Sequence, residues 1–177
     1  SRGLGDVYKR QLQVITKALL SVRAVLRTEF AAFEKQTRKM AQSDARTRLL
    51  MSTPAVGPIV ALTYASAIDD PARFKSSKQA GAHFGLTPKK YQSGETDYTG
   101  RISKIGDASV RTALYEAANV MLTKPVKGCP RLKSWAMRIK QRAGTSKAKV
   151  ALARRLAVIM HRMLADGTPF NDAVAAA

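Results

Sequence analysis

The sequence predicts a mainly α protein, in which a long coiled-coil-like helix precedes a compact helical domain with an irregular central loop. Three observations support this fold class. Apolar residues recur at helical spacing along most of the chain, turn-forming residues gather between residues 84 and 111, and 45% hydrophobic residues among 177 suffice for a core. We therefore divide the chain into residues 1–11, a linker helix at 12–46, a compact domain at 47–166 and a flexible tail at 167–177.

The charge balance indicates a polyanionic partner. The chain has 31 Lys and Arg residues against 12 Asp and Glu residues, a formal charge of +19. Nucleic acid is the partner we favour, with an acidic membrane surface as the rival. No apolar run approaches the roughly 18 residues that span a bilayer, and the single cysteine, Cys129, excludes an internal disulfide. We expect a cytoplasmic, nucleoid-associated setting.

The first eleven residues, SRGLGDVYKRQ, show no periodicity that continues into Leu12. The string resembles the translated read-through of a sequencing adapter. We therefore set residues 1–11 apart from the fold, and we expect the natural chain to extend further toward the N-terminus.

The next segment predicts one long helix, from Leu12 to about Met40. Its apolar residues alternate steps of three and four, which is typical of a heptad seam, although Glu29 and Gln36 interrupt the seam. Neither Gly nor Pro occurs between Leu12 and Ser52. The seam residues are Leu12, Ile15, Leu19, Val22, Leu26, Phe33 and Met40. The helix could pack on its own domain, but the long, narrow seam favours a coiled coil that joins copies or domains.

Residues 52–58 predict a tight turn before a second helix at 59–68. The helix, the Pro54–Pro58 turn and the following helix resemble a helix-hairpin-helix element, in which helix N–H groups near Gly57 would face a phosphate. Such hairpins usually carry glycine where this chain has Ala55. A simple packed helical hairpin explains the pattern equally well.

Short helices are expected to follow. Asp69 and Asp70 precede Pro71, which is more typical of a helix cap than of a metal site. A second short helix should run from Lys78 to Phe84 and end at Gly85. His83 has no partner nearby in the sequence, so we interpret it as a packing or surface residue.

The central segment, Leu86 to Ile105, combines turn residues with cations and tyrosines. Lys89, Lys90, Arg101 and Lys104 alternate with Tyr91 and Tyr98, a composition that suits contacts with phosphates and bases. Asp107 then predicts the N-cap of a helix at 108–123, with Arg111 in its first turn. The buried stripe of that helix should be Val110, Leu114, Ala117, Ala118 and Met121.

The C-terminal half is basic. Between Glu116 and Asp166 the sequence contains twelve cations and no acid, which a solvated surface alone does not explain. We expect helices at 132–142 and 147–165, the latter with Leu152, Leu156, Ile159 and Met163 on its inner face. Trp135 is interpreted as a core residue rather than a base-stacking platform, and His161 is assigned no chemistry.

Several motifs recur here in a family order. They are Pro54–Pro58, Phe74–Ser76, Gly85–Pro88, Ser93-Gly94, Gly100–Gly106, Arg111 and the helix that starts at Lys147. Over Leu12 to Asp166 the chain resembles the C-terminal transposase domain of the insertion sequence 110 family, the DEDD-type, bridge-RNA-guided DNA recombinases. Residues 47–166 would then form a serine-containing transposase domain.

The resemblance assigns roles that spacing alone does not. It implies that Ser93 is a nucleophile that joins a DNA 5′ phosphate, whereas a Ser-Gly pair in a loop is otherwise read as a turn. Ser103 is the second choice, as a phosphate contact. The nucleic-acid-binding residues that we expect are Gly57, Lys89, Lys90, Tyr98, Arg101, Ser103, Lys104, Arg111, Lys147 and Arg154.

The resemblance also implies partners. These are DNA, a guide RNA, and Mg²⁺ held by an N-terminal RNase-H-like domain that these residues do not include, so we assign no metal ligand here. We expect a homo-oligomer through the leading helix.

Two alternatives stay open: a non-catalytic nucleic-acid-binding remnant, which would bind without cleaving, and a membrane-surface protein, which would bind acidic liposomes but not duplex DNA or structured RNA.

Overall fold

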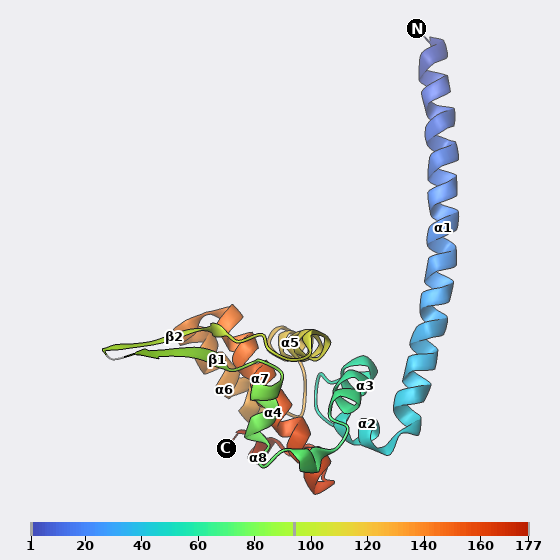
Figure 1. Cartoon of the computed structure of the whole chain (residues 1–177). Helices are drawn as coiled ribbons and strands as arrows, with labels where there is room; N and C mark the ends of the chain where they lie inside the picture. Colours follow the sequence, from blue (N-terminus) through green and yellow to red (C-terminus); the bar gives the residue numbers. More distant parts are fainter. Residues whose placement is uncertain (1, 94, 177) are drawn as a thin grey trace. The chain divides into compact units, whose positions relative to one another are not determined.

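The computed structural model describes residues 2–93 and 95–176, so Gly94 of the Ser93-Gly94 pair lies outside the described residues. The chain divides into two compact units, residues 1–40 and 41–177, and each is considered by itself. Helices dominate, and the described residues form one two-stranded sheet (Figure 1). The mainly α fold class is confirmed.

The first unit is a single helix. Helix α1 runs from Arg2 to Ser43 without interruption, so it includes most of the segment that the sequence set apart. Its apolar side chains are exposed, from 53% for Leu20 to 71% for Phe30, with Leu12, Ile15, Leu19, Val22, Leu26 and Phe33 between these values. A seam of this kind is what a partner helix would cover, and oligomerisation through it stays a prediction.

A cap that the sequence reading overlooked separates α1 from α2 (Ala45–Leu50). The Asp44 carboxylate accepts hydrogen bonds from the backbone N–H groups of Arg46 (3.3 Å) and Thr47 (3.0 Å). The buried Thr47 hydroxyl donates to the Ala41 carbonyl at 2.6 Å. The signal was the Asp itself, a preferred N-cap residue inside an apparently continuous helical pattern.

Three long helices enclose the core of the second unit. They are α5 (Ala108–Thr123), α6 (Pro130–Ala143) and α7 (Thr145–Asp166), and α3 (Pro58–Ala67) packs against α5. The predicted inner faces of α5 and α7 are buried as expected. Tyr64 of α3 extends this core, because its hydroxyl donates to the Ala157 carbonyl at 2.6 Å.

Two short elements connect α3 to the central segment, the 3-10 helix η1 (Pro71–Arg73) and α4 (Lys78–His83). Asp70 caps η1 by accepting from the Ala72 N–H at 2.9 Å, as the sequence predicted. The buried His161 of α7 holds both elements: Nδ1 lies 3.0 Å from Ser77 Oγ and Nε2 lies 3.1 Å from the Pro71 carbonyl. The imidazole thus has a structural role.

The segment expected to be an irregular loop forms an antiparallel hairpin instead. Strand β1 (Pro88–Ser93) pairs with β2 (Thr96–Ile102), with Tyr91 opposite Tyr98 and Lys90 opposite Thr99. Near the start of β1 the strand register shifts between Pro88 and Lys90, which indicates a β-bulge. The glycines and the proline of this segment predict a loop, whereas aromatic and β-branched residues paired across the strands favour the sheet.

The C-terminal segment has defined contacts where a flexible tail at 167–177 was expected. Helix α8 (Asp172–Ala176) supplies the Asp172 carboxylate, which accepts from the N–H groups of Arg131 (2.8 Å) and Leu132 (3.0 Å) and so caps α6. Arg155 Nε donates to the Ala175 carbonyl at 2.8 Å.

Among the helices of the described residues, none combines the length and apolar character that a membrane crossing requires.

Candidate nucleic-acid interface

Two glycines hold the base of the hairpin against α4. Gly85 and Gly106 have φ angles of +65° and +87°, in the left-handed region that favours glycine. A Cβ atom on Gly85 would overlap the Ile105 carbonyl oxygen, and one on Gly106 would overlap the His83 carbonyl oxygen. The two chain segments therefore cross at a separation that excludes any side chain. The Lys104 N–H donates to the Gly85 carbonyl at 3.1 Å beside this crossing.

Arg111 joins the same crossing. Its Nη1 donates to the carbonyls of Phe84 (3.2 Å), Ile105 (3.2 Å) and Gly106 (2.9 Å). The sequence assigned Arg111 to nucleic acid, but this geometry makes it a residue that positions the hairpin. Ser103 is half-buried, and its backbone N–H donates to the Thr87 carbonyl at 2.9 Å, so it belongs to the same anchor.

Ser93 lies at the other end of the hairpin. It is exposed and is the last residue of β1, paired with Thr96. Side chains alternate between the faces of a strand, so Ser93 shares a face with Tyr91. Asp97 pairs with Gln92 and therefore lies on the opposite face. Ser93 thus stands on a tyrosine-bearing face, and Asp97 is not the base beside it.

A groove at the base of the hairpin brings together four of the predicted binding residues. Its volume is about 840 Å³, and it is lined from α4, the hairpin base, α6 and α7. Its cations are Lys78, Arg101, Lys104, Lys147, Arg154 and Arg155. None of the described residues that line it is acidic. A groove with six cations and no acidic residue in its own lining suits a polyanion.

The same groove also has apolar lining residues. These include Leu86, Ile102, Val150, Val158 and the half-buried Trp135 of α6. The guanidinium carbon of Arg155 lies 5.7 Å from the centre of the Trp135 ring. Arg154 packs over α4, since a Cβ atom on Gly81 would lie 2.9 Å from Arg154 Cγ. Trp135 therefore lines the groove as well as packing against the core. The sequence did not identify three members of this groove, namely Trp135, Lys78 and Arg155.

The remaining predicted residues lie outside this groove. Lys89 and Lys90 are exposed on β1, and Tyr98 is 55% exposed on β2. Gly57 is the N-cap of α3, with open space where a Cβ atom would be. Ala55 has a φ angle of +66°, a conformation that explains why glycine is usual at this position of such hairpins.

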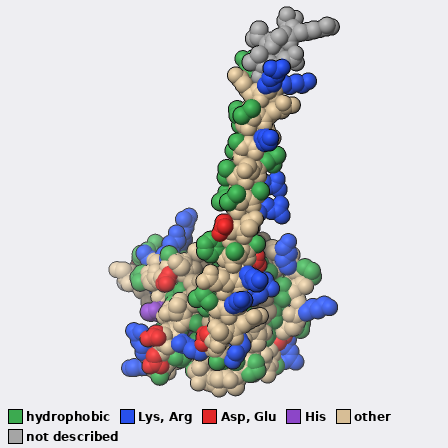
Figure 2. Space-filling view, turned by 90° about the vertical axis from the view of Figure 1, so that its right-hand side faces the viewer, with side chains coloured by type: hydrophobic (Ala, Val, Ile, Leu, Met, Phe, Trp, Pro, Cys, Tyr) green, Lys and Arg blue, Asp and Glu red, His purple; other side chains and the backbone are tan. Residues whose placement is uncertain are grey.

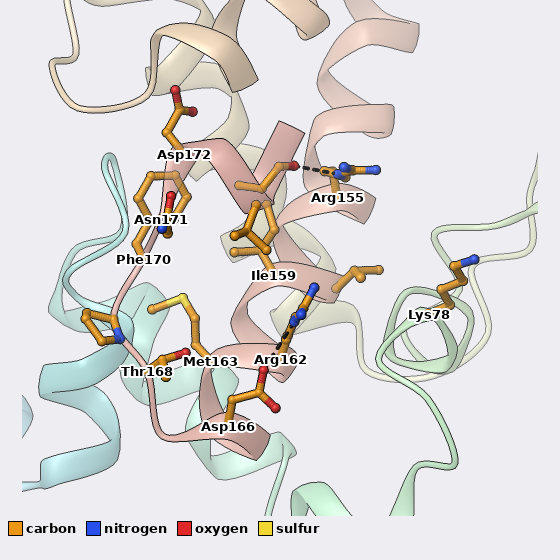
Figure 3. A pocket seen from close by; sticks show the side chains of 14 residues that line it. Lys78, Arg155, Ile159, Arg162, Met163, Asp166, Thr168, Phe170, Asn171 and Asp172 are labelled. Atoms are coloured by element: carbon orange, nitrogen blue, oxygen red, sulfur yellow. Dashed lines mark hydrogen bonds and ion pairs between the residues drawn. The ribbon is translucent and has the colours of Figure 1, made fainter. Parts of the chain in front are cut away.

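A second hollow of about 840 Å³ lies between α7 and the C-terminal segment (Figure 3). It shares Lys78 and Arg155 with the first, but here acidic groups face the cations. Arg162 Nε lies 3.2 Å from the Asp166 carboxylate, and Asp172 also lines the hollow. Figure 2 likewise shows acidic side chains interspersed with Lys and Arg over the face that it presents. The first groove is distinguished by having cations but no acidic residue among its lining residues.

The described residues contain no group of three or more His, Cys, Asp or Glu side chains placed to hold a metal ion. Asp97 lies on the opposite face of the hairpin from Ser93. The described residues thus offer no cluster of ligands for Mg²⁺ near Ser93, and we derive no step of the reaction through a metal here.

Comparison with known proteins points to one family. Residues 47–134 match the family described as "Transposase IS116/IS110/IS902 family". The chain is similar to "Probable family 20 transposase" of Pseudomonas aeruginosa, with 29% identity over 82% of this chain and 43% of that protein. It is also similar to "Transposase for insertion sequence element IS1111A" of Coxiella burnetii, with 29% identity over 92% of this chain and 43% of that protein.

A third relative is "Transposase for insertion sequence element IS1328" of Yersinia enterocolitica, with 29% identity over 78% of this chain and 41% of that protein. The chain thus spans about two fifths of the length of the curated relatives that it matches. The matched family region contains the hairpin, the glycine crossing and Arg111, and it ends just before Trp135.

Proposed function

Because residues 47–134 match the transposase family IS116/IS110/IS902, we propose that the chain is the serine-bearing part of a transposase that cuts and joins DNA strands. The observation that carries this proposal is the hairpin: an exposed Ser93 stands at its tip, and a groove lined by six cations lies at its base. A nucleic-acid strand whose phosphates are held by these cations could extend along the hairpin toward the serine hydroxyl.

In this proposal the Ser93 hydroxyl attacks a backbone phosphate. The bond between Oγ and phosphorus forms as the bond between phosphorus and the 3′ oxygen breaks, which leaves a 5′ phosphate on the serine and a free 3′ hydroxyl. The serine proton passes to a base and the departing oxygen receives a proton. We assign both proton transfers, and the Mg²⁺ of the family, to an RNase-H-like domain outside these 177 residues.

The partners follow from the same proposal. DNA and a guide RNA share the cationic surface of the second unit, and copies of the chain associate through the exposed apolar seam of α1. We expect the protein to act at the bacterial nucleoid. A helix-hairpin-helix role for α2 and α3 would add a phosphate contact at Gly57.

The nucleophile is tested by trapping a covalent protein–DNA adduct. In the full-length transposase that contains this chain, Ser93→Ala should abolish the adduct while DNA binding persists. Ser103→Ala is the matched control, because Ser103 lies in the anchor of the hairpin, and that variant should retain the adduct. An adduct that survives Ser93→Ala contradicts the assignment.

Binding is tested separately by its dependence on salt. If the six groove cations each neutralise one phosphate, affinity for nucleic acid should fall roughly 10³-fold between 50 and 200 mM salt. Lys147→Ala should reduce the salt slope by about one phosphate contact. Arg38→Ala is the control, because Arg38 already pairs with Glu34 at 3.3 Å on α1. Its slope should not change.

A non-catalytic nucleic-acid-binding module is the second candidate. It is favoured by the register of the hairpin, which directs Asp97 away from Ser93 while the groove is complete within the chain. This candidate predicts salt-sensitive binding without any adduct, even in the full-length protein. The two experiments together separate the candidates.

A further inference from the structure

The groove at the hairpin base has two chemically different parts. Six cations line it, and apolar side chains, with Trp135 among them, make up most of the remaining lining. Charge alone would suit any polyanion, but the phosphates of a duplex do not cover apolar surface. A ligand that is anionic on one side and apolar on another would match both kinds of lining residue.

An unpaired nucleotide has this character. In a duplex the flat faces of the bases are stacked inside, and only phosphates, sugars and base edges face outward. An unpaired base exposes its face, which stacks on aromatic side chains and on guanidinium planes. The groove offers both in Trp135 and Arg155, whose guanidinium carbon lies 5.7 Å from the ring centre.

This pair is held in place before any ligand binds. Arg155 Nε donates to the Ala175 carbonyl at 2.8 Å, and Trp135 packs against the core. The Asp172 carboxylate in turn fixes the start of α6, the helix that carries Trp135. A platform that is fixed in advance loses little conformational entropy on binding.

The size of the groove agrees with one or two nucleotides. Its volume of about 840 Å³ falls within the roughly 300–1,000 Å³ of sites that enclose a small ligand.

We propose that this groove binds an unpaired nucleotide of a DNA or RNA strand, with its base against the apolar lining residues beside Trp135 and Arg155 and its flanking phosphates on the cations. This inference rests on the proposed nucleic-acid function and specifies the ligand of that site. It assigns the groove to a nucleotide that is unstacked from its neighbours, and it predicts a preference for single strands that the charge alone does not give.

Tryptophan fluorescence of this chain comes from the groove alone, because Trp135 is its only tryptophan. The experiment is to titrate the 177-residue chain with oligothymidylate of about ten nucleotides, a length within the range of single-strand sites, and to follow tryptophan fluorescence. The matched ligands are a duplex of the same length and an abasic strand with the same phosphates. Oligouridylate of equal length distinguishes an RNA strand from a DNA strand as the preferred source.

We expect the single strand to quench the fluorescence at low salt, and the duplex and the abasic strand to quench it much less. Trp135→Ala should weaken single-strand affinity about tenfold, measured by anisotropy of a labelled strand, while Trp135→Phe should retain most of it. The measurement on the unaltered chain keeps the test valid if Trp135→Ala does not fold.

Two outcomes overturn the inference, and they differ in what else they overturn. If duplex and single strand bind equally and neither quenches Trp135, the groove does not hold a base, although the proposed nucleic-acid function stands. If no oligonucleotide binds even at low salt, the proposed function of the chain fails together with the inference.

Discussion

Tyr91 and Tyr98 stack across the hairpin, with ring centroids 4.7 Å apart and ring planes 9° apart. The pair lies on the face that carries Ser93. The Tyr91 ring also covers Gly100, where a Cβ atom would lie 2.9 Å from the ring. Since both strands of the hairpin are largely exposed, this stack is the main side-chain contact that fixes their register.

We predict that Tyr98→Ala loosens the hairpin without unfolding the protein. An aromatic cross-strand pair contributes about 0.5–1.5 kcal/mol beyond its buried area, and the core does not depend on it. Hydrogen exchange of the β1 and β2 amides should accelerate by up to about tenfold, while the thermal midpoint changes little. Gln92→Ala, on the opposite face, is the control. Equal acceleration in both variants would contradict a role for the stack.

Arg111→Ala should destabilise the fold by about 1–3 kcal/mol, because three carbonyls lose their charged donor. Urea denaturation measures this loss. Arg138→Ala, an exposed cation of α6, should cost much less. If Arg111 is primarily a nucleic-acid contact, its removal will instead lower affinity and leave the free energy of unfolding unchanged.

Ala55→Gly should stabilise the protein. A left-handed conformation costs a non-glycine residue about 1–2 kcal/mol, and the substitution removes this cost from the folded state. Glycine also gives the unfolded chain more conformational freedom, which offsets the gain in stability by about 0.5–1 kcal/mol. A net increase of up to about 1 kcal/mol in the free energy of unfolding is expected. Ala113→Gly, inside α5, is the control and should destabilise by about 1 kcal/mol.

Stability should fall as the pH is lowered through the range in which histidine titrates. Burial lowers the pKa of His161 below its ordinary value of 6.5, while the hydrogen bond to the Pro71 carbonyl opposes the shift. Between the lowered pKa and 6.5 the unfolded chain binds more protons than the folded chain, so protonation favours unfolding. The stabilising contribution is complete above 6.5 and is lost progressively as the pH falls toward the lowered value.

The thermal midpoint measured between about pH 7.5 and pH 5.5 checks this prediction. His161→Gln should remove the decline, whereas His83→Gln should keep it, because His83 is exposed and is the only other histidine. A decline that persists unchanged in His161→Gln would assign the pH dependence to other groups.

Asp172→Ala should release the C-terminal segment. Its carboxylate accepts two backbone hydrogen bonds at the start of α6, and losing an N-cap acceptor costs about 1 kcal/mol. Limited proteolysis should then cut after residue 167, and the Arg155 contact to Ala175 should be lost with it. Asp69→Ala, an exposed neighbour of the η1 cap, should leave the proteolysis unchanged.

The helices were predictable because their signals are local. Asp107 before α5 and the periodic apolar residues of α5 and α7 specify elements that need no distant partner to be recognised. The hairpin was not predicted, because the pairing of Tyr91 with Tyr98 depends on the strand register, and the glycines in this segment are typical of a loop. The break at Asp44 was missed for a related reason: the helical pattern continues on both sides of it.

The site divides in the same way. Arg101, Lys104, Lys147 and Arg154 were recognised from charge, and one groove brings them together. Arg111 was recognised as a cation in a family motif, but its partners are carbonyls that only the folded chain places beside it. Trp135 and Lys78 belong to the groove because α4, α6 and α7 meet there, and no spacing in the sequence shows that meeting.

The glycine crossing at Gly85 and Gly106 fixes the base of the hairpin, so a small rotation there would be amplified at the tip. Five residue steps separate Pro88 at its base from Ser93 at its tip, a length of roughly 16 Å at about 3.3 Å per residue. A rotation of about 5° at the base would therefore displace Ser93 by more than 1 Å. If Ser93 is the nucleophile that we propose, an error of that size would cost about a hundredfold in rate, so backbone contacts at the far end of the hairpin would set the alignment of its hydroxyl.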